Sequence, residues 1–118
     1  MLQKRYRITK QKEFDRFFGQ AFKKIRGQSA AGGIFVVKTI KNNLTFCRFG
    51  FVVPNTIDKR ATARNRIKRQ LREIVRTKMK EFRPGFDVLV IVKTAIKGKG
   101  RPQIEDELLK LFNGLSVI

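Results

Sequence analysis

Apolar and polar positions recur along the chain with two different periods, and each period predicts one kind of element. Near the N-terminus, five apolar residues fall on one face of a helix that is expected to begin after a capping Thr9: Phe14, Phe17, Phe18, Ala21 and Phe22. The glycine-rich interval 26–33 predicts a loop. The β-branched run 34–40 predicts a strand, and Asn42 and Asn43 predict a tight turn after it.

The second half of the chain continues this alternation. Residues 44–53 place side chains on two faces, as a strand does, and Gly50 leaves open whether they form one strand or two. A basic helix follows, expected to end at Pro84 and Gly85, and its apolar residues have a helical period: Ile67, Leu71, Ile74, Val75, Met79 and Phe82. Residues 86–93 predict a central strand, and a last helix is predicted from Pro102 to a C-cap at Gly114.

These elements predict one α+β domain over residues 1–118, in which the helices and a small sheet share a core. The charge indicates its partner: 28 Lys and Arg against nine Asp and Glu give a formal net charge of +19, which favours nucleic acid. A membrane surface is the rival partner, but membrane-surface helices usually stand outside a packed domain. The single cysteine and the lack of a long apolar run or signal-peptide core predict a cytoplasmic protein with no membrane partner.

The basic helix carries two neighbouring ridges of side chains spaced four residues apart. One ridge is apolar and is expected to dock the helix on the sheet, and the other is entirely cationic: Arg64, Lys68, Arg72, Arg76 and Lys80. Like charges at this spacing disfavour the helix, and Glu73 is expected to pair with Arg69. The alternative to a binding surface is a basic face that only contacts solvent, but the arginine content favours binding to a row of phosphates.

The remaining residues that could stack, react or bind a metal indicate binding rather than catalysis. The Phe residues of the first helix are either core or a stacking platform for unpaired bases, and the sequence leaves both open. The chain has no His, its carboxylates form no catalytic or metal-binding motif, and Cys47 is expected to be a small core residue. We therefore expect no catalytic or metal-binding residue in this chain.

Residues 63–76, "ARNRIKRQLREIVR", resemble the signature helix of the bacterial ribonuclease P protein subunit family. The stretches "KRYRI", "EFDRFF", "FGFVV" and "FDVLVIVK" are similar to the family's N-terminal segment, first helix and flanking strands. The resemblance implies an α-β-β-β-α-β-α two-layer sandwich with a four-stranded sheet and a left-handed β-α-β crossover, similar to ribosomal proteins. It also implies an accessory subunit, a monomer in a 1:1 complex with a catalytic RNA. That RNA holds Mg²⁺ and removes the 5′ leader of precursor tRNA.

The resemblance assigns two sets of binding residues. Contacts with the catalytic RNA are expected from the signature: Arg64, Asn65, Arg66, Lys68, Arg69 and Arg72. Arg76 extends the ridge, and Asn55, Lys59 and Arg60 stand where the family tends to have a Ser-Lys-Lys stretch. The single-stranded leader is expected between the first helix and the sheet, at Phe14, Phe18, Val36 and Lys38, although the family often has an aromatic residue in place of Lys38.

Three other functions fit parts of the pattern. A non-catalytic RNA-binding protein of the ribosome or of RNA assembly would have the same charge, so composition alone does not separate it from the first interpretation. A DNA-binding helix module needs a second helix just before the basic one, where residues 44–53 are strand-like. A protein-only nuclease is disfavoured by the missing His and the scattered acidic residues.

Overall fold

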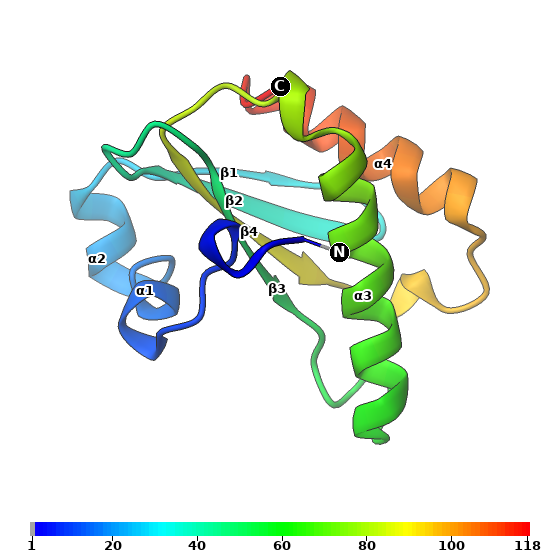
Figure 1. Ribbon diagram of the computed structural model, residues 1–118. Coiled ribbons are helices and arrows are strands. Elements are labelled where there is room, and N and C mark those ends of the chain that lie inside the picture. The colour runs from blue at the N-terminus through cyan, green and yellow to red at the C-terminus, as the bar shows by residue number, and fades with distance from the viewer. Residues whose placement is uncertain (1) are drawn as a thin grey trace.

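Four strands, three of them rich in β-branched and aromatic residues, form one mixed sheet in the computed structural model, which describes residues 2–118 (Figure 1). The strands are β1 (Gln28–Ala31), β2 (Phe35–Lys41), β3 (Arg48–Val52) and β4 (Phe86–Val92). Their spatial order is β1-β2-β4-β3, with β1–β2 and β2–β4 antiparallel and β3–β4 parallel. The sheet centre is therefore β2 and β4, and β4 pairs with both of its neighbours.

The helices connect these strands and cover both faces of the sheet. They are α1 (Gln11–Asp15), α2 (Gly19–Lys24), α3 (Ala61–Thr77) and α4 (Arg101–Gly114), with short 3₁₀ turns η1 (Lys4–Tyr6), η2 (Met79–Glu81) and η3 (Thr94–Ile96). The connection from β3 through α3 to β4 is a β-α-β crossover between adjacent parallel strands. The predicted α+β class, the four-stranded sheet and the α-β-β-β-α-β-α order are thus confirmed, with α1 and α2 in place of a single first helix.

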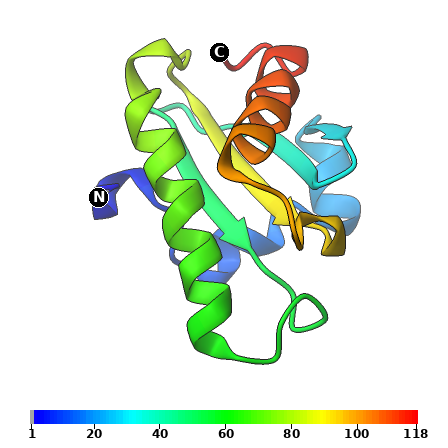
Figure 2. The same cartoon turned by 90° about the vertical axis from the view of Figure 1, so that its right-hand side faces the viewer.

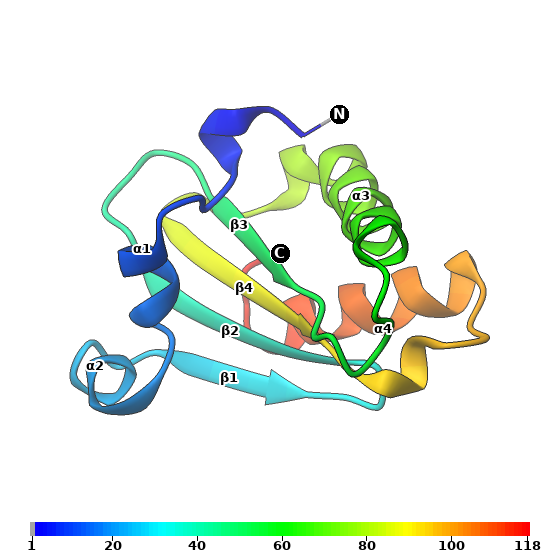
Figure 3. The same cartoon turned by 90° about the horizontal axis from the view of Figure 1, so that it is seen from below.

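The two faces of the sheet carry cores of different size. On the face that we call the α3 face, α3 and α4 lie side by side over the sheet, with α1 and α2 behind it (Figure 2). A large buried cluster joins that face to both helices, through Leu71, Ile74 and Val75 of α3 and Leu108 and Phe112 of α4. The opposite face, the α1 face, holds a small buried cluster: Ile8, Phe17, Ile40 and Leu89. Figure 3 shows α1 and α2 gathered at one end of this face.

The predicted first helix is broken in two. Phe18 has an extended backbone (φ −129°, ψ 154°) and Gly19 has a positive φ of 62°, so α1 ends before them and α2 begins in a new direction. The Phe residues of this segment therefore do not share one helical face. The predicted Thr9 cap is also wrong, because Lys10 is the N-cap residue and no side chain caps α1.

The predicted boundaries differ from the structure at three other places. The glycine-rich interval predicted as a loop contains the edge strand β1, which pairs with β2. Residues 44–47 are not in a strand, so only β3 comes from the stretch 44–53. The basic helix ends at Thr77 rather than near Pro84, which leaves Lys80 in η2 and outside the helical ridge.

The last helix ends close to the predicted position but with a different residue in the left-handed conformation. Gly114 is the final residue of α4, and the positive φ belongs to Ser116 (59°), two residues later. A residue with a Cβ thus occupies a conformation in which glycine is usual after a helix. Asn43 has a positive φ of 59°, as the turn chemistry predicted.

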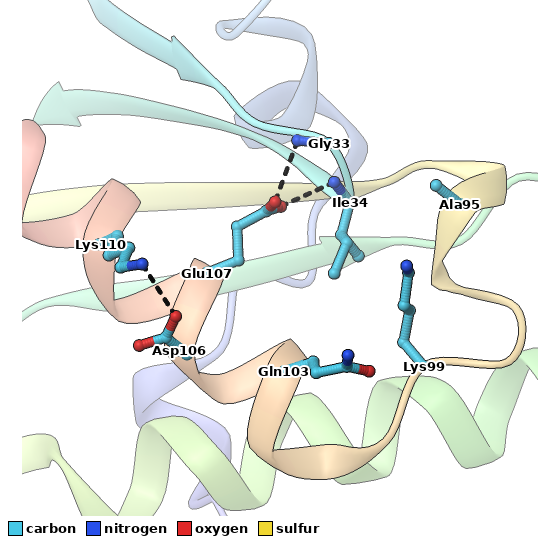
Figure 4. A pocket seen from close by; sticks show the side chains of 8 residues that line it. All are labelled: Gly33, Ile34, Ala95, Lys99, Gln103, Asp106, Glu107 and Lys110. Carbon is cyan, nitrogen blue, oxygen red and sulfur yellow. Dashed lines mark hydrogen bonds and ion pairs between the residues drawn. The ribbon is translucent and has the colours of Figure 1, made fainter.

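A carboxylate from α4 holds the turn between β1 and β2 (Figure 4). Glu107 accepts hydrogen bonds from the amides of Gly33 (3.0 Å), Ile34 (2.7 Å) and Phe35 (3.0 Å). Lys93 adds a bond from its Nζ to the carbonyl of Gly32 at 2.7 Å. These bonds satisfy backbone groups at the turn, and they fix the start of β2 against α4.

Candidate nucleic-acid interface

Helix α3 presents its predicted basic residues to solvent because its apolar side is buried on the sheet. Leu71, Ile74 and Val75 are fully buried. Of the residues assigned to RNA binding on the helix and its N-cap, five have exposed side chains and three are half-buried at the edge of the contact with the sheet. The exposed ones are Arg60, Asn65, Arg66, Arg69 and Arg76, and the half-buried ones are Arg64, Lys68 and Arg72.

Three of the predicted cations already have partners within the protein. Arg64 donates from Nη1 to the carbonyls of Asp58 and Lys59, each at 2.9 Å, so it ties the preceding loop to the helix. Arg60 pairs with Asp58 (Nη2–Oδ2 3.1 Å), and its hydrogen bonds lower the pKa of that carboxyl to about 2. Arg76 pairs with Glu73, which corrects the expected pair between Glu73 and Arg69.

The other predicted cations of this region have no side-chain hydrogen bond or ion pair with any residue from 2 to 118. They are Lys59, Arg66, Lys68, Arg69 and Arg72. Four of them lie on α3, where neighbours three or four residues apart repel one another. This surface is therefore electrostatically incomplete within the described part of the chain, and an external anion would stabilise it.

An arginine hollow lies between α3 and the N-terminal segment. It has a volume of about 430 Å³ and is lined by Arg7, Arg69, Arg72 and Glu73. The Nε atoms of Arg7 and Arg72 are both buried and have no hydrogen-bond partner within residues 2–118. Burial lowers the pKa of Arg72, and the neighbouring charges of Arg7 and Arg69 lower it further.

Arg7 was not among the predicted binding residues, although it lies in the "KRYRI" stretch that the family resemblance includes. Its position follows from tertiary structure: residue 7 bridges to Phe49 at the edge strand β3, which brings the N-terminal segment beside α3. The run of cations before Ile8 is the signal that could have drawn attention to it.

The four residues predicted to bind the leader are brought together on the α1 face. Phe14 of α1 lies over Gly50 of β3, where a Cβ would approach the Phe14 ring to 2.9 Å. Phe18 follows α1 and is 46% exposed, whereas the neighbouring Phe17 is fully buried. Each of the two predicted alternatives therefore holds for a different Phe residue. Phe17 belongs to the core and Phe18 is exposed, whereas Phe14 and Phe22 are half-buried.

Lys38 of β2 contacts the segment that contains α1 and α2. Its Nζ donates to the carbonyl of Phe17 at 3.0 Å and lies 4.5 Å from the ring centre of Phe18 and 5.0 Å from that of Phe22. Val36, two residues earlier on β2, points to the same face and is half-buried. Lys38 therefore contacts Phe18 from one side by a cation–π interaction.

An ion-pair network anchors α1 to this face. Arg48 of β3 pairs with the fully buried Asp87 of β4 (Nη2–Oδ2 2.6 Å) and with Glu13 of α1 (Nη1–Oε2 2.5 Å). Asn42 also donates to Asp87, at 2.9 Å. These charges raise the pKa of Arg48, mainly through the hydrogen bond to Asp87.

The cysteine and the acidic side chains are the remaining groups that could react or bind a metal. Cys47 is buried as predicted, its thiol donates to the carbonyl of Arg83 at 2.8 Å, and burial raises its pKa. Within residues 2–118, no three His, Cys, Asp or Glu side chains come together where they could hold a metal ion. Among the same residues, no helix is long and apolar enough to cross a membrane.

The chain matches known proteins over nearly its whole length. The family model described as Ribonuclease P matches residues 2–116. The "Ribonuclease P protein component" of Pelotomaculum thermopropionicum is 36% identical over 87 residues, which cover 74% of this chain and 77% of the relative. That of Clostridium acetobutylicum is 30% identical and covers 98% of this chain and 92% of the relative.

Two solved structures share the fold. A mutant of the Staphylococcus aureus RNase P protein has a TM-score of 0.84 at 32% identity, and the match covers 98% of this chain and 92% of that one. The RNase P protein of Thermotoga maritima has a TM-score of 0.68 at 32% identity, over 78% of this chain and 88% of that one. The sequence and structural matches agree with the resemblance of the signature helix, and the chain belongs to the ribonuclease P protein family.

Proposed function

We propose that this chain binds the catalytic RNA of ribonuclease P through α3 and the arginine hollow, and the single-stranded 5′ leader of precursor tRNA through the α1 face. Family membership makes the chain the protein component of a tRNA-processing ribonucleoprotein, and it favours this function over that of a ribosomal or assembly protein. The protein acts as a monomer in a 1:1 cytoplasmic complex. The catalytic groups and Mg²⁺ belong to the RNA.

The observation that carries the proposal is the arginine hollow. Two buried guanidinium nitrogens, on Arg7 and Arg72, lack a hydrogen-bond partner in the described chain. Arg69 adds a third positive charge, against the single carboxylate of Glu73 in the lining. A buried polar group without a partner costs about 1–3 kcal/mol, more when it is charged. A phosphate oxygen supplies the missing acceptor, and its charge offsets the burial and the repulsion that lower the pKa of Arg72.

Binding of the leader is supported by the different positions of Phe17 and Phe18. Phe17 packs in the small core, and the adjacent Phe18 remains 46% exposed. Stacking on an aromatic ring tolerates any base, which suits a leader whose sequence varies between precursors. Lys38 adds positive charge directly beside the ring.

The test removes two arginines that are exposed and have no side-chain partner in the described chain. The double variant Arg66→Ala/Arg69→Ala is expected to weaken association with a bacterial ribonuclease P RNA by at least about ten-fold, and to make binding less dependent on salt, because fewer phosphates are neutralised. Arg101→Ala/Lys110→Ala removes the same charge from α4 and serves as the control. Association is measured by filter binding across a series of salt concentrations, with circular dichroism to confirm folding.

The same assay compares precursor with mature tRNA in the reconstituted holoenzyme. Preference for the precursor is expected, and it should decrease as salt increases. Equal affinity for the two tRNAs would contradict leader binding, and an unchanged association of the α3 variant would contradict the RNA contact.

A further inference from the structure

A second cationic hollow lies at the end of the sheet, where four segments distant in sequence meet. We call it the end hollow. It has a volume of about 450 Å³ and is formed by the end of α2, the last residues of β2, the segment before β4 and the segment after α4. These segments contribute, among others, Ile25, Arg26, Lys41, Arg83 and Ser116. None of them belongs to the signature helix or to the group on the α1 face.

The charge in the end hollow is one-sided. Arg26, Lys41 and Arg83 line it, and no carboxylate does. None of these three side chains makes a hydrogen bond or an ion pair with another residue in the range 2–118. The hollow beside α4 shown in Figure 4 is different, because Asp106 and Glu107 balance its lysines. The end hollow thus brings together three cations that no carboxylate of its lining offsets.

The backbone adds an independent observation. Arg26 (φ 56°) and Ser116 (φ 59°) both have left-handed conformations, directly after the C-cap residues of α2 and α4. Glycine is the usual residue there, because a Cβ makes this conformation unfavourable. Both residues line the end hollow, and such unfavourable backbone conformations cluster at binding sites. Arg26 contributes a guanidinium group and Ser116 a hydroxyl group at positions where glycine would be conformationally more favourable.

Part of the wall of the end hollow is apolar, beside its polar and charged lining residues. Ile25 is 39% exposed and Phe86 is half-buried, so both offer surface to a planar ring beside the three cations. Six residues of α2, or about 9 Å of helix, separate Ile25 from Phe18 on the α1 face. Guanidinium groups beside an apolar surface match the phosphate and base of a nucleotide.

We propose that the end hollow binds a nucleotide of single-stranded RNA, with its phosphate held by Arg26, Arg83 and Lys41 and its base against Ile25 and Phe86. The identity of the ligand as RNA rests on the proposed function. The strand is either the leader beyond the part that contacts Phe18 or a segment of the catalytic RNA. Both present the same phosphodiester chemistry.

The test uses a variant that removes charge without disturbing the fold. Arg26→Asn/Arg83→Gln eliminates two guanidinium groups, and Asn tolerates the left-handed conformation better than Arg. Lys23→Gln/Lys24→Gln is the matched control, since it removes the same charge from α2 at residues that do not line the hollow. Each holoenzyme is reconstituted with a bacterial ribonuclease P RNA. Assembly of each variant with that RNA is measured first by titration. The reconstituted holoenzyme is then titrated with a long-leader precursor, a precursor whose leader is too short to extend past Phe18, and mature tRNA.

The hollow variant is expected to bind RNA about five-fold more weakly than the control, or weaker still. The log–log slope of its affinity against salt should be shallower by about 0.7 for each single-strand phosphate that is no longer neutralised. Its melting temperature should be unchanged or higher. A loss confined to the long-leader precursor assigns the leader as the ligand, and a loss in assembly with the RNA subunit itself assigns the catalytic RNA.

Affinity and salt slope equal to those of the control in every titration would overturn the proposal. The variant Arg66→Ala/Arg69→Ala is titrated in parallel to separate the two ideas. If that variant loses affinity while the hollow variant does not, the proposed function stands and the end hollow is not a site. If neither variant loses affinity, the proposed function has failed as well.

Discussion

The two faces of the sheet are built from the same four strands but are held by different forces. The α3 face buries a continuous apolar cluster against two helices. The α1 face has a small buried apolar cluster, and an ion-pair network anchors α1 to the sheet. The large core provides most of the apolar burial, so the other face can leave Phe18 and the half-buried Phe14 and Val36 accessible. Stability and binding are thereby separated by the alternation of side chains along each strand.

The largest expected effect on stability comes from the α3 face. Phe112→Ala should destabilise the protein by about 4 kcal/mol, because this ring is fully buried and its centre lies 5.1 Å from that of Phe82. Phe18→Ala on the other face should change the free energy of unfolding by less than about 1 kcal/mol. It should instead weaken binding of precursor tRNA by about ten-fold, because a stacking surface is removed. Urea unfolding and precursor titration of both variants check the comparison, which fails if Phe18→Ala destabilises as much as Phe112→Ala.

An intermediate effect is expected at the ion pair that anchors α1. Asp87→Asn should destabilise the protein by about 2 kcal/mol, below the usual range for breaking a buried pair because Arg48 keeps Glu13 and is about a fifth exposed. The change should loosen α1 specifically, which hydrogen exchange of residues 11–15 would report. Glu13→Gln tests the same link from the helix side. If hydrogen exchange in Asp87→Asn became faster to the same extent over the whole sheet, the ion pair would support the main core rather than α1.

The smallest effect is expected at a pair outside both faces. Arg60 lowers the pKa of Asp58 to about 2, so the pair contributes stability above the ordinary Asp pKa and loses it as pH falls through about 2. The pair lies at the surface, so the change should stay local. Arg60→Gln should return the pKa of Asp58 toward its usual range, as measured by NMR titration of the carboxyl carbon. The distant variant Arg101→Gln should leave that pKa unchanged.

The sequence predicted those elements whose pattern is strong within a single segment. The β-branched runs identified β2 and β4, and the apolar stripe identified α3, although not its end at Thr77. Strand β1 was missed because it is a short, largely exposed edge strand of Gln, Ser and Ala beside glycines, with little β-forming character of its own. The break at Gly19 was missed because the spacing of the Phe residues fits an unbroken helix equally well.

The candidate sites divide in the same way. The exposed Arg76 of α3 follows from helical spacing alone, whereas Arg66 and Arg69 were assigned from the resemblance of the signature helix. Arg7 lines the arginine hollow, and Arg26 and Arg83 line the end hollow, only because segments far apart in sequence meet there. No local sequence pattern identifies these residues together as candidates for binding. The sequence also did not reveal that Arg64 has partners within the protein, since hydrogen bonds to loop carbonyls depend on the path of the chain.

The position of β4 between β2 and β3 has a consequence for biosynthesis. While a ribosome has delivered only the residues before 86, the emerging polypeptide can form the β1–β2 hairpin, but β3 has no neighbouring strand among the described residues except the single bridge to Arg7. Helix α3 is therefore translated before the surface that buries its apolar side is complete. During that interval the nascent chain displays both its arginines and its leucine and valine stripe, at the surface of a particle made largely of RNA.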